Sequence, residues 1–550
     1  MLILLPIWLF LGVEFWCLGT LLLEFCFPHA VIDQQDKFWV SQWLGIVILA
    51  NLLLVISFFI PLTTAVGITI WILAIGAVIL WRRTRLKLQE LLGSLNRRSI
   101  YAGLIVVILV SAFSSTTVTF YDTGLYHYQV IKWLANFGAV PGLGLVHNRF
   151  AFPAPFFTIS AILDQGIFTN RAGGVVTGFI ILILLSQLLA IVHKITDASQ
   201  EKFFSDYFLA VYSGYTLISV CVFSFGILKS LSPDPIVAFM SGIPLWVMLI
   251  DRQNSSPSTC LIAVLLASGL VSFKWSGLVI LGVVYIWAIF NFPKSNLKEF
   301  IFNGMLISGI ALLPLIPTLS YGFITSGCPL FPSGILCMDV PWGVGKLRAE
   351  EVKLIITNWQ KWGAVTPPDP NPWGWLIPWA QREVQAVIQI CVSITCSFLT
   401  LFQSPKNVEW RPISKYVLGM GLGGIVYMMV LSPAIRFGVG YVSIIPAFWL
   451  AQFISCRTFG KRWEVGLWLA LVIFWLIPIV YYRSTDLLMP QQLPQASQLE
   501  TKQAIDFSYL MPQNDDRCWS ADLPCTPENL DRVRLLNPDR GIGGGFRRAD

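Results

Sequence analysis

Polar and ionisable side chains gather in one short stretch of an otherwise apolar chain. Asp122 is followed by Tyr126 and His127, and His147 and Arg149 come soon after, so two of the four histidines lie here. A carboxylate where an apolar segment meets water usually marks a functional site, although an Asp at a helix start also serves as an N-cap. The polar and aromatic neighbours of Asp122 favour a functional site. For each His alone, a hydrogen bond at the membrane interface is the simpler interpretation.

Three more charged residues stand at breaks between apolar runs. Asp234 lies between two prolines, where an Asx-type turn explains it equally well. Lys274 requires an anionic partner, either a phosphate or one of the two Asp residues, unless its ammonium group reaches the interface. Arg436 carries a fork of donors that suits phosphate, and a plain interfacial arginine is the alternative.

These residues belong to a chain that is too apolar for a water-soluble fold. Of its 550 residues 55% are hydrophobic and only 12% are charged, and its mean hydropathy is +0.69. Soluble domains average about 25% charged residues. The composition predicts an all-α polytopic membrane protein and excludes secreted, nuclear and cytosolic proteins. The net charge of +7 requires no nucleic acid, because basic cytoplasmic loops explain it.

Apolar runs long enough to cross about 30 Å of hydrocarbon predict about fourteen transmembrane helices. The chain starts without a basic region before its first apolar run, so that run is interpreted as a span rather than a signal peptide. We expect an N-terminal extension of three spans over 1–82 and a membrane core over 83–482. A polar tail follows over 483–550.

Lysine and arginine in the short loops predict the orientation. The segment 82–98 carries six basic residues, which places it in the cytoplasm. Alternation then puts the loops 118–172 and 320–385 outside, together with the tail. For a bacterial cell, this is the inner membrane with the candidate site facing the periplasm.

Cysteine positions give an independent indication of sidedness. Four of the eleven cysteines fall in the outside segments as two close pairs, Cys328 with Cys337 and Cys518 with Cys525. Disulfides persist only in oxidising compartments, so each pair is expected to form a disulfide. Four unpaired thiols are the alternative.

The first outside loop is expected to contain one short helix over 123–137, lying at the outer membrane surface. Asp122 or Thr123 can cap its start, and Gly138 supplies a stop. Its spacing places Asp122, Tyr126 and Gln129 on one helix face.

This loop resembles the first outside loop of the GT-C superfamily of membrane glycosyltransferases. The shared features are a span that emerges outside, an acidic residue directly after it, a Tyr, an amphipathic helix and a Gly stop. The resemblance as a whole covers roughly residues 100–460. The resemblance implies that Asp122 is the catalytic base and that the donor is a sugar linked to polyprenyl phosphate. Many members carry a second acid beside the first, whereas this chain has Asp122-Thr123-Gly124.

The resemblance also implies roles for the other candidates. Asp234 is similar in place to an acidic residue of the second outside loop, and Arg436 resembles a late arginine-aromatic motif that grips a lipid phosphate. The chemistry of such a transfer, rather than the resemblance, assigns Lys274 together with Arg436 to the phosphate charge, and Tyr126 and His127 to substrate binding. Two Asp and a His could hold a divalent metal, but no spacing requires one.

The sequence therefore predicts a membrane glycosyltransferase that moves a sugar from a polyprenyl-phosphate-linked donor to an acceptor at the outer face. Its partners would be that donor and membrane lipids, and the sugar and acceptor stay open. A polysaccharide polymerase or ligase is the first alternative and would rely on Arg and His rather than an early Asp. A secondary transporter is the second; it would place broken helices at mid-membrane in two similar halves, and the chain contains no internal repeat.

Overall fold

The computed structural model describes residues 1–94, 97–153, 155–251, 256–292, 296–369, 371–402, 411–457, 459–482 and 488–549. Positions 95–96 of the basic segment, and 483–487 and 550 of the tail, lie outside the described residues. Most of the described chain is helical, which confirms the predicted helical class.

Within the described residues, eight helices are long and apolar enough to cross a membrane. They are α1 (Leu4–Cys26), α2 (Gln34–Ser57), α9 (Val175–Thr196), α10 (Phe204–Ser224), α15 (Leu297–Ser326), α18 (Val384–Phe402), α19 (Arg411–Leu431) and α20 (Ile435–Ser455). A ninth span results if α3 (Thr64–Leu80) and α4 (Arg82–Ser94), which are bent by 94°, are counted together. By length and composition, the described helices therefore give eight or nine spans, fewer than the fourteen predicted.

The other predicted spans fall on helices that are not among these eight. These are α5 (Arg97–Ser114), α11 (Asp234–Met240), α12 (Ile243–Ile250), α13 (Pro257–Phe273) and α14 (Leu278–Asn291), and α21 (Lys461–Tyr482) follows α20. Several of their ends are fixed by polar breaks: α11 begins at Asp234, and α13 ends just before Lys274. The breaks that shorten these helices therefore also carry two of the candidate site residues.

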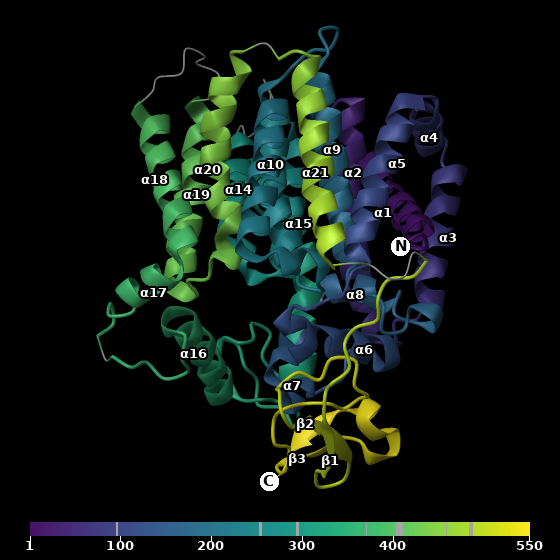
Figure 1. Cartoon of the computed structure of the whole chain (residues 1–550), viewed down its shortest axis with the longest axis vertical. Helices are drawn as coiled ribbons and strands as arrows, with labels where there is room; N and C mark the ends of the chain where they lie inside the picture. Colours follow the sequence, from purple (N-terminus) through teal and green to yellow (C-terminus); the bar gives the residue numbers. More distant parts are fainter. Residues whose placement is uncertain are drawn as a thin grey trace.

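The long helices stand side by side, and the segments expected outside gather at one end of this bundle (Figure 1). That end holds short helical pieces and the two helices of the 320–385 loop, whereas α4 lies at the other end. The pieces are η1 (Thr123–His127), α6 (Tyr128–Phe137), α7 (Leu143–Val146), η2 (Asn148–Ala151), α8 (Pro155–Ala161), η3 (Gly166–Phe168), η4 (Phe225–Lys229), η5 (Trp275–Gly277), α16 (Lys346–Trp362) and α17 (Leu376–Arg382).

The first helices share the hydrophobic core of the rest of the bundle. Trp43 Nε1 donates to Gln187 Oε1 at 2.9 Å, and Asn51 Nδ2 donates to Ser272 Oγ at 3.1 Å. Helices α1 and α2 pack closely at Gly45, where an added Cβ would lie 2.0 Å from the carbonyl oxygen of Phe15. Small residues allow such close backbone approach between helices in membranes.

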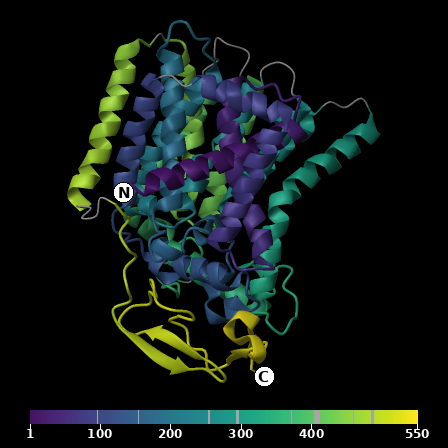
Figure 2. The ribbon, with the colours of Figure 1, turned by 90° about the vertical axis from the view of Figure 1, so that its right-hand side faces the viewer.

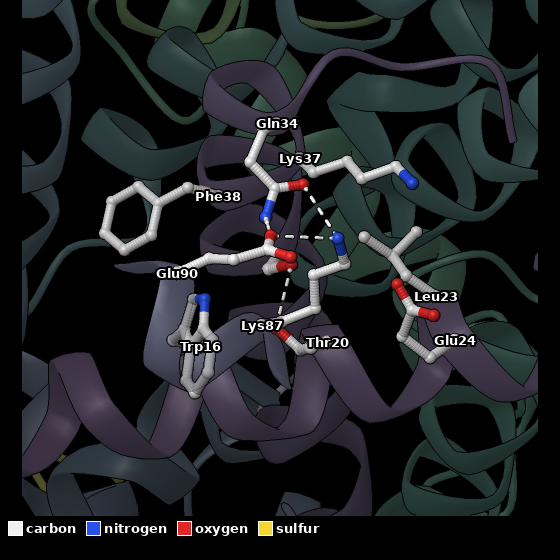
Figure 3. A pocket seen from close by; sticks show the side chains of 10 residues that line it. Trp16, Thr20, Leu23, Glu24, Gln34, Lys37, Phe38, Lys87 and Glu90 are labelled. Atoms are coloured by element: carbon white, nitrogen blue, oxygen red, sulfur yellow. Dashed lines mark hydrogen bonds and ion pairs between the residues drawn. The ribbon is translucent and has the colours of Figure 1, made fainter. Parts of the chain in front are cut away.

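At the far end of the bundle, polar contacts tie α4 to the start of α2. Lys87 Nζ lies 3.0 Å from Glu90 Oε2, and Gln34 Nε2 donates to the same oxygen at 2.6 Å (Figure 3). They line a small pocket of about 110 Å³. The basic segment is thereby fixed at the end of the bundle opposite the candidate site residues.

The polar tail forms a small β module below the bundle (Figure 2). Strand β1 (Leu499–Gln503) pairs antiparallel with β2 (Ser508–Pro512), and β3 (Val533–Leu535) pairs with β4 (Phe546–Arg548); η7 (Pro538–Gly544) lies between the last two strands. These strands correct the all-α prediction for this segment. They are too short and too polar to leave an alternating apolar pattern.

Candidate functional site

The helix predicted over 123–137 is present, but it contains a one-residue insertion. It begins as the π-helical turn η1, continues as α6 and ends at Gly138, whose φ of 78° favours glycine. The insertion moves Gln129 off the face of Asp122, so the predicted alignment of Gln129 with Asp122 and Tyr126 is wrong. Instead, Gln129 Nε2 donates to the carbonyls of Trp519 and Ala521 in the tail.

Asp122 does not cap this helix with its side chain. The residue is 8% exposed, and its carboxylate accepts from two arginines, Arg149 Nη1 at 3.2 Å and Arg436 Nη1 at 2.8 Å. Such charge-assisted hydrogen bonds are roughly twice as strong as neutral ones. The N-cap interpretation therefore does not account for Asp122.

Asp234 and Lys274 extend this group of charges. Asp234, the first residue of α11, is buried and ion-paired with Lys274 Nζ, and Arg436 Nε lies 3.9 Å from its other oxygen. The Lys274 ammonium also lies 3.9 Å from the centre of the Phe437 ring. The charges thus alternate in the order Arg149, Asp122, Arg436, Asp234, Lys274, and we call these five residues the charge chain.

Burial and neighbouring charge set the protonation states in the first outside loop. Burial would raise the pKa of Asp122, but the positive charges of Arg436, of His127 when protonated, and of Arg149 lower it to about 2. Burial lowers the pKa of His127 to about 3. Near pH 7 the site therefore presents an ionised Asp122 beside a neutral His127.

One cavity of about 920 Å³ at this end of the bundle is lined by all six residues predicted for catalysis or substrate binding. They are Asp122, Tyr126, His127, Asp234, Lys274 and Arg436. Much of the remaining wall is apolar and comes from the first loop, α13, α16, α19 and α20, including Phe120, Phe157, Phe273, Ile355, Ile356, Met428, Leu431 and Phe437. The cavity is thus charged at one part of its wall and apolar elsewhere, as expected for an amphipathic ligand.

Residues without an assigned role also reach this cavity. Arg149 lies next to Asp122, with its guanidinium 5.5 Å from the centre of the Tyr126 ring. Asp516 comes from the tail and accepts from the Tyr121 hydroxyl. The sequence could have indicated Arg149 as a site residue, because Arg149 belongs to the polar stretch after Asp122. Nothing in the sequence indicated Asp516, because only docking of the tail brings this residue to the cavity.

His147 is a local structural residue rather than part of the cavity wall. Its Nδ1 accepts from the backbone N–H of Arg149 at 3.1 Å, and its ring stacks on Phe150. This contact helps to hold the turn that presents Arg149 to Asp122.

The four cysteines of the segments expected outside are joined as Cys328–Cys337 and Cys518–Cys525. The first pair lies just after α15 in the 320–385 loop, and the second closes a loop of the tail. Across the described residues, no group of three or more His, Cys, Asp or Glu side chains is arranged to hold a metal ion. Arg436, rather than a cation site, lies between the two carboxylates.

The sequence model of the family described as a domain of unknown function (DUF8201) matches residues 1–443, so the chain belongs to this family. The matched part includes the whole charge chain and leaves out the C-terminal β module. Among curated proteins, no match to the chain is found.

Proposed function

We propose that this member of the DUF8201 family is a GT-C-type membrane glycosyltransferase, which moves a sugar from a polyprenyl-phosphate-linked donor to an acceptor at the outer face. One observation carries the proposal: Asp122, Asp234, Lys274 and Arg436, spread over four separate segments, line a single cavity. Charges that only capped helices or reached the interface independently would have no reason to meet there.

The walls of the cavity support a lipid-linked phosphate as ligand. Lys274 and Arg436 offer an ammonium and a guanidinium group to phosphate oxygens. The aromatic and aliphatic wall suits an isoprenoid chain, since removing apolar surface from water is favourable. A nucleotide-sugar donor fits less well, because the cavity is lined by α16, which lies at the end of the bundle opposite α4 of the basic segment.

The ion pairs suggest how donor binding would prepare the base. With both arginines bound, Asp122 has a pKa of about 2, which makes it a weak base. A donor phosphate would compete with Asp122 for Arg436 and so raise the basicity of the carboxylate. Asp122 then takes the proton of the acceptor hydroxyl as that oxygen bonds to the sugar carbon. The bond from this carbon to the phosphate oxygen breaks, and its electron pair stays on the phosphate, next to Lys274 and Arg436.

The proposal includes a topology. We propose that the shorter apolar helices also cross the membrane, giving fourteen spans, and that the protein lies in a bacterial inner membrane with the cavity toward the periplasm. The positions of the basic segment and of the cavity at opposite ends of the bundle support this orientation.

The test uses the purified full-length protein in lipid nanodiscs. It is incubated with undecaprenyl-phosphate-linked hexoses and pentoses, with an envelope extract as the acceptor source, and released undecaprenyl phosphate is measured by mass spectrometry. We expect release by the wild type and by Asp197→Asn, an aspartate in the α9–α10 connection, but not by Asp122→Asn. The proposal fails if none of these donors is consumed, or if Asp122→Asn is as active as the wild type.

A further inference from the structure

The insertion in the Asp122 helix leaves one carbonyl without its usual helical donor. In an α-helix the N–H of Tyr128 would bond to the carbonyl four residues earlier, that of Gly124. Here it donates to Thr123 instead, five residues earlier, as in a π-helical turn. The carbonyl of Gly124 is passed over, and Gly124 is buried, so water does not replace the missing donor.

The C-terminal module supplies that donor. The backbone N–H of Trp519 bonds to the Gly124 carbonyl at 2.8 Å. On the next turns of the helix, Gln129 donates to the carbonyls of Trp519 and Ala521, and Lys132 Nζ donates to that of Ala521 at 2.7 Å. The contacts come from residues 519–521, inside the loop closed by the Cys518–Cys525 disulfide.

The fit between the two segments is close. A Cβ added at Gly124 would lie 2.6 Å from the Trp519 ring. Trp519 itself has a φ of 46°, a backbone conformation that bulky residues rarely adopt unless their surroundings impose it. Its ring and its N–H are therefore held in place together.

We propose that the C-terminal module, residues 488–549, positions the candidate base: the Trp519 N–H stabilises the π-helical turn that aims Asp122 into the cavity. Without this donor the buried Gly124 carbonyl would be unpaired, which is costly. The segment would then favour the α-helical register, in which Tyr128 bonds to Gly124. In that register the turn holds one residue fewer, so the segment before it, which includes Asp122, would be rotated by about 100° about the helix axis. This rotation would move Asp122 away from Arg149 and Arg436. Trp519 is thus a positioning residue.

Trp519 lies outside the part of the chain that matches the DUF8201 family. The family match ends at residue 443, so the helix is controlled by a segment beyond the matched region. The same docking brings Asp516 to the cavity wall. The claim about the turn stands on the hydrogen bonds alone, and only its consequence for turnover rests on the proposed function.

The test compares four full-length variants in nanodiscs by hydrogen–deuterium exchange of the peptide 120–132. Gly124→Ala should displace the Trp519 ring and speed exchange by about tenfold or more. Gly103→Ala, at a glycine with open space around it, is the matched control. Trp519→Gly removes the ring, keeps the N–H and suits a positive φ, so it should exchange as the wild type does. Gly124→Ala combined with Trp519→Gly should recover most of the protection.

Either of two results would overturn the proposal. If Gly124→Ala exchanges as slowly as the control, the module does not hold the turn. If the peptide 120–132 exchanges as fast in Trp519→Gly as in Gly124→Ala, the Trp519 ring rather than its N–H stabilises the turn. In the donor assay, Gly124→Ala should lower kcat more than it raises KM, with recovery in the double variant. A wild type that consumes no donor would refute the proposed function, while the exchange data would still decide the role of Trp519.

Discussion

Arg436 contacts both carboxylates of the cavity, with Nη1 on Asp122 and Nε facing Asp234. A single guanidinium group therefore neutralises parts of two buried charges, and Lys274 and Arg149 complete the balance at either end. The two carboxylates are buried and the three basic side chains are half-buried, and each of the five is ion-paired, because an unpaired buried charge would be costly. The residues that we assign to catalysis are consequently also important for stability.

The pair of Asp234 and Lys274 provides a test of this double role. Asp234→Asn leaves the Lys274 ammonium without its main partner, and we expect it to lower the free energy of unfolding by about 2 kcal/mol. The effect stays below that of a fully buried pair, because the Lys274 side chain is 27% exposed. Thermal unfolding in detergent measures it, with Asp197→Asn as control. Adding Lys274→Met should restore part of the loss; a double variant less stable than Asp234→Asn would contradict the pairing.

His127 predicts a dependence of stability on pH. Burial lowers its pKa from 6.5 to about 3, so between these values the unfolded chain binds a proton that the folded chain does not. Its contribution to stability is complete above pH 6.5 and is lost as the pH falls toward 3, by at most about 1.4 kcal/mol per pH unit.

Unfolding of the wild type and of His127→Gln at pH 7 and pH 5 measures this contribution. The variant should lose less stability over this interval, whereas His29→Gln, at an exposed histidine, should behave as the wild type. Equal losses in the wild type and His127→Gln would show that His127 is not the group responsible.

Among the elements, the loop 118–172 depends on a segment far away in the chain. Helix α6 is amphipathic enough to be predicted, yet its polar face lies against the tail rather than water: Lys132 reaches the carbonyls of residues 520 and 521. The tail also contacts the loop through Thr526, which donates to the carbonyl of Val146 at 2.8 Å. The loop and the module are therefore expected to lose their structure together.

The disulfide of the module tests this coupling. Replacing Cys518 and Cys525 by Ser removes the closure of a short loop and should destabilise the module by about 2 kcal/mol. Hydrogen exchange should become faster over 508–526 and also over 120–132. The replacement of Cys26, an exposed free cysteine, by Ser is the control. Faster exchange in the module with an unchanged first loop would argue against coupling.

In the whole molecule, α4, which carries much of the basic segment, lies at one end of the bundle, and α16, which lines the cavity, lies at the other (Figure 1). Lys87 and Glu90 of α4 hydrogen-bond to Gln34 of α2, and the charge chain lines the cavity. This separation agrees with an orientation set by cytoplasmic lysine and arginine.

Labelling of introduced cysteines in intact cells tests the orientation. In a chain whose exposed free cysteines Cys26, Cys391 and Cys456 are replaced by Ser, an impermeant thiol reagent should label Lys361→Cys but not Arg83→Cys. Both should react after the cells are opened. Labelling of Arg83→Cys in intact cells would reverse the topology and place the cavity in the cytoplasm.

The features that depend on local composition and periodicity could be predicted from the sequence. Apolar runs predicted where helices lie, since a helix at membrane depth satisfies its own backbone groups. Gly138 marked the end of the first-loop helix, and the polar breaks at Asp234 and Lys274 marked helix ends. Asp122, Lys274 and Arg436 could be singled out because ionisable groups are rare and costly in such surroundings.

How these residues pair, and what surrounds them, depends on packing between segments that are distant in the chain. The sequence left three anions open as partners of Lys274, and packing of α11 against the end of α13 selected Asp234. The one-residue insertion after Asp122 leaves no pattern in the sequence, because its skipped carbonyl is satisfied by Trp519, almost 400 positions away. The β module and Asp516 were missed for the same reason: contacts between distant segments fix their positions, and no local periodicity encodes such contacts.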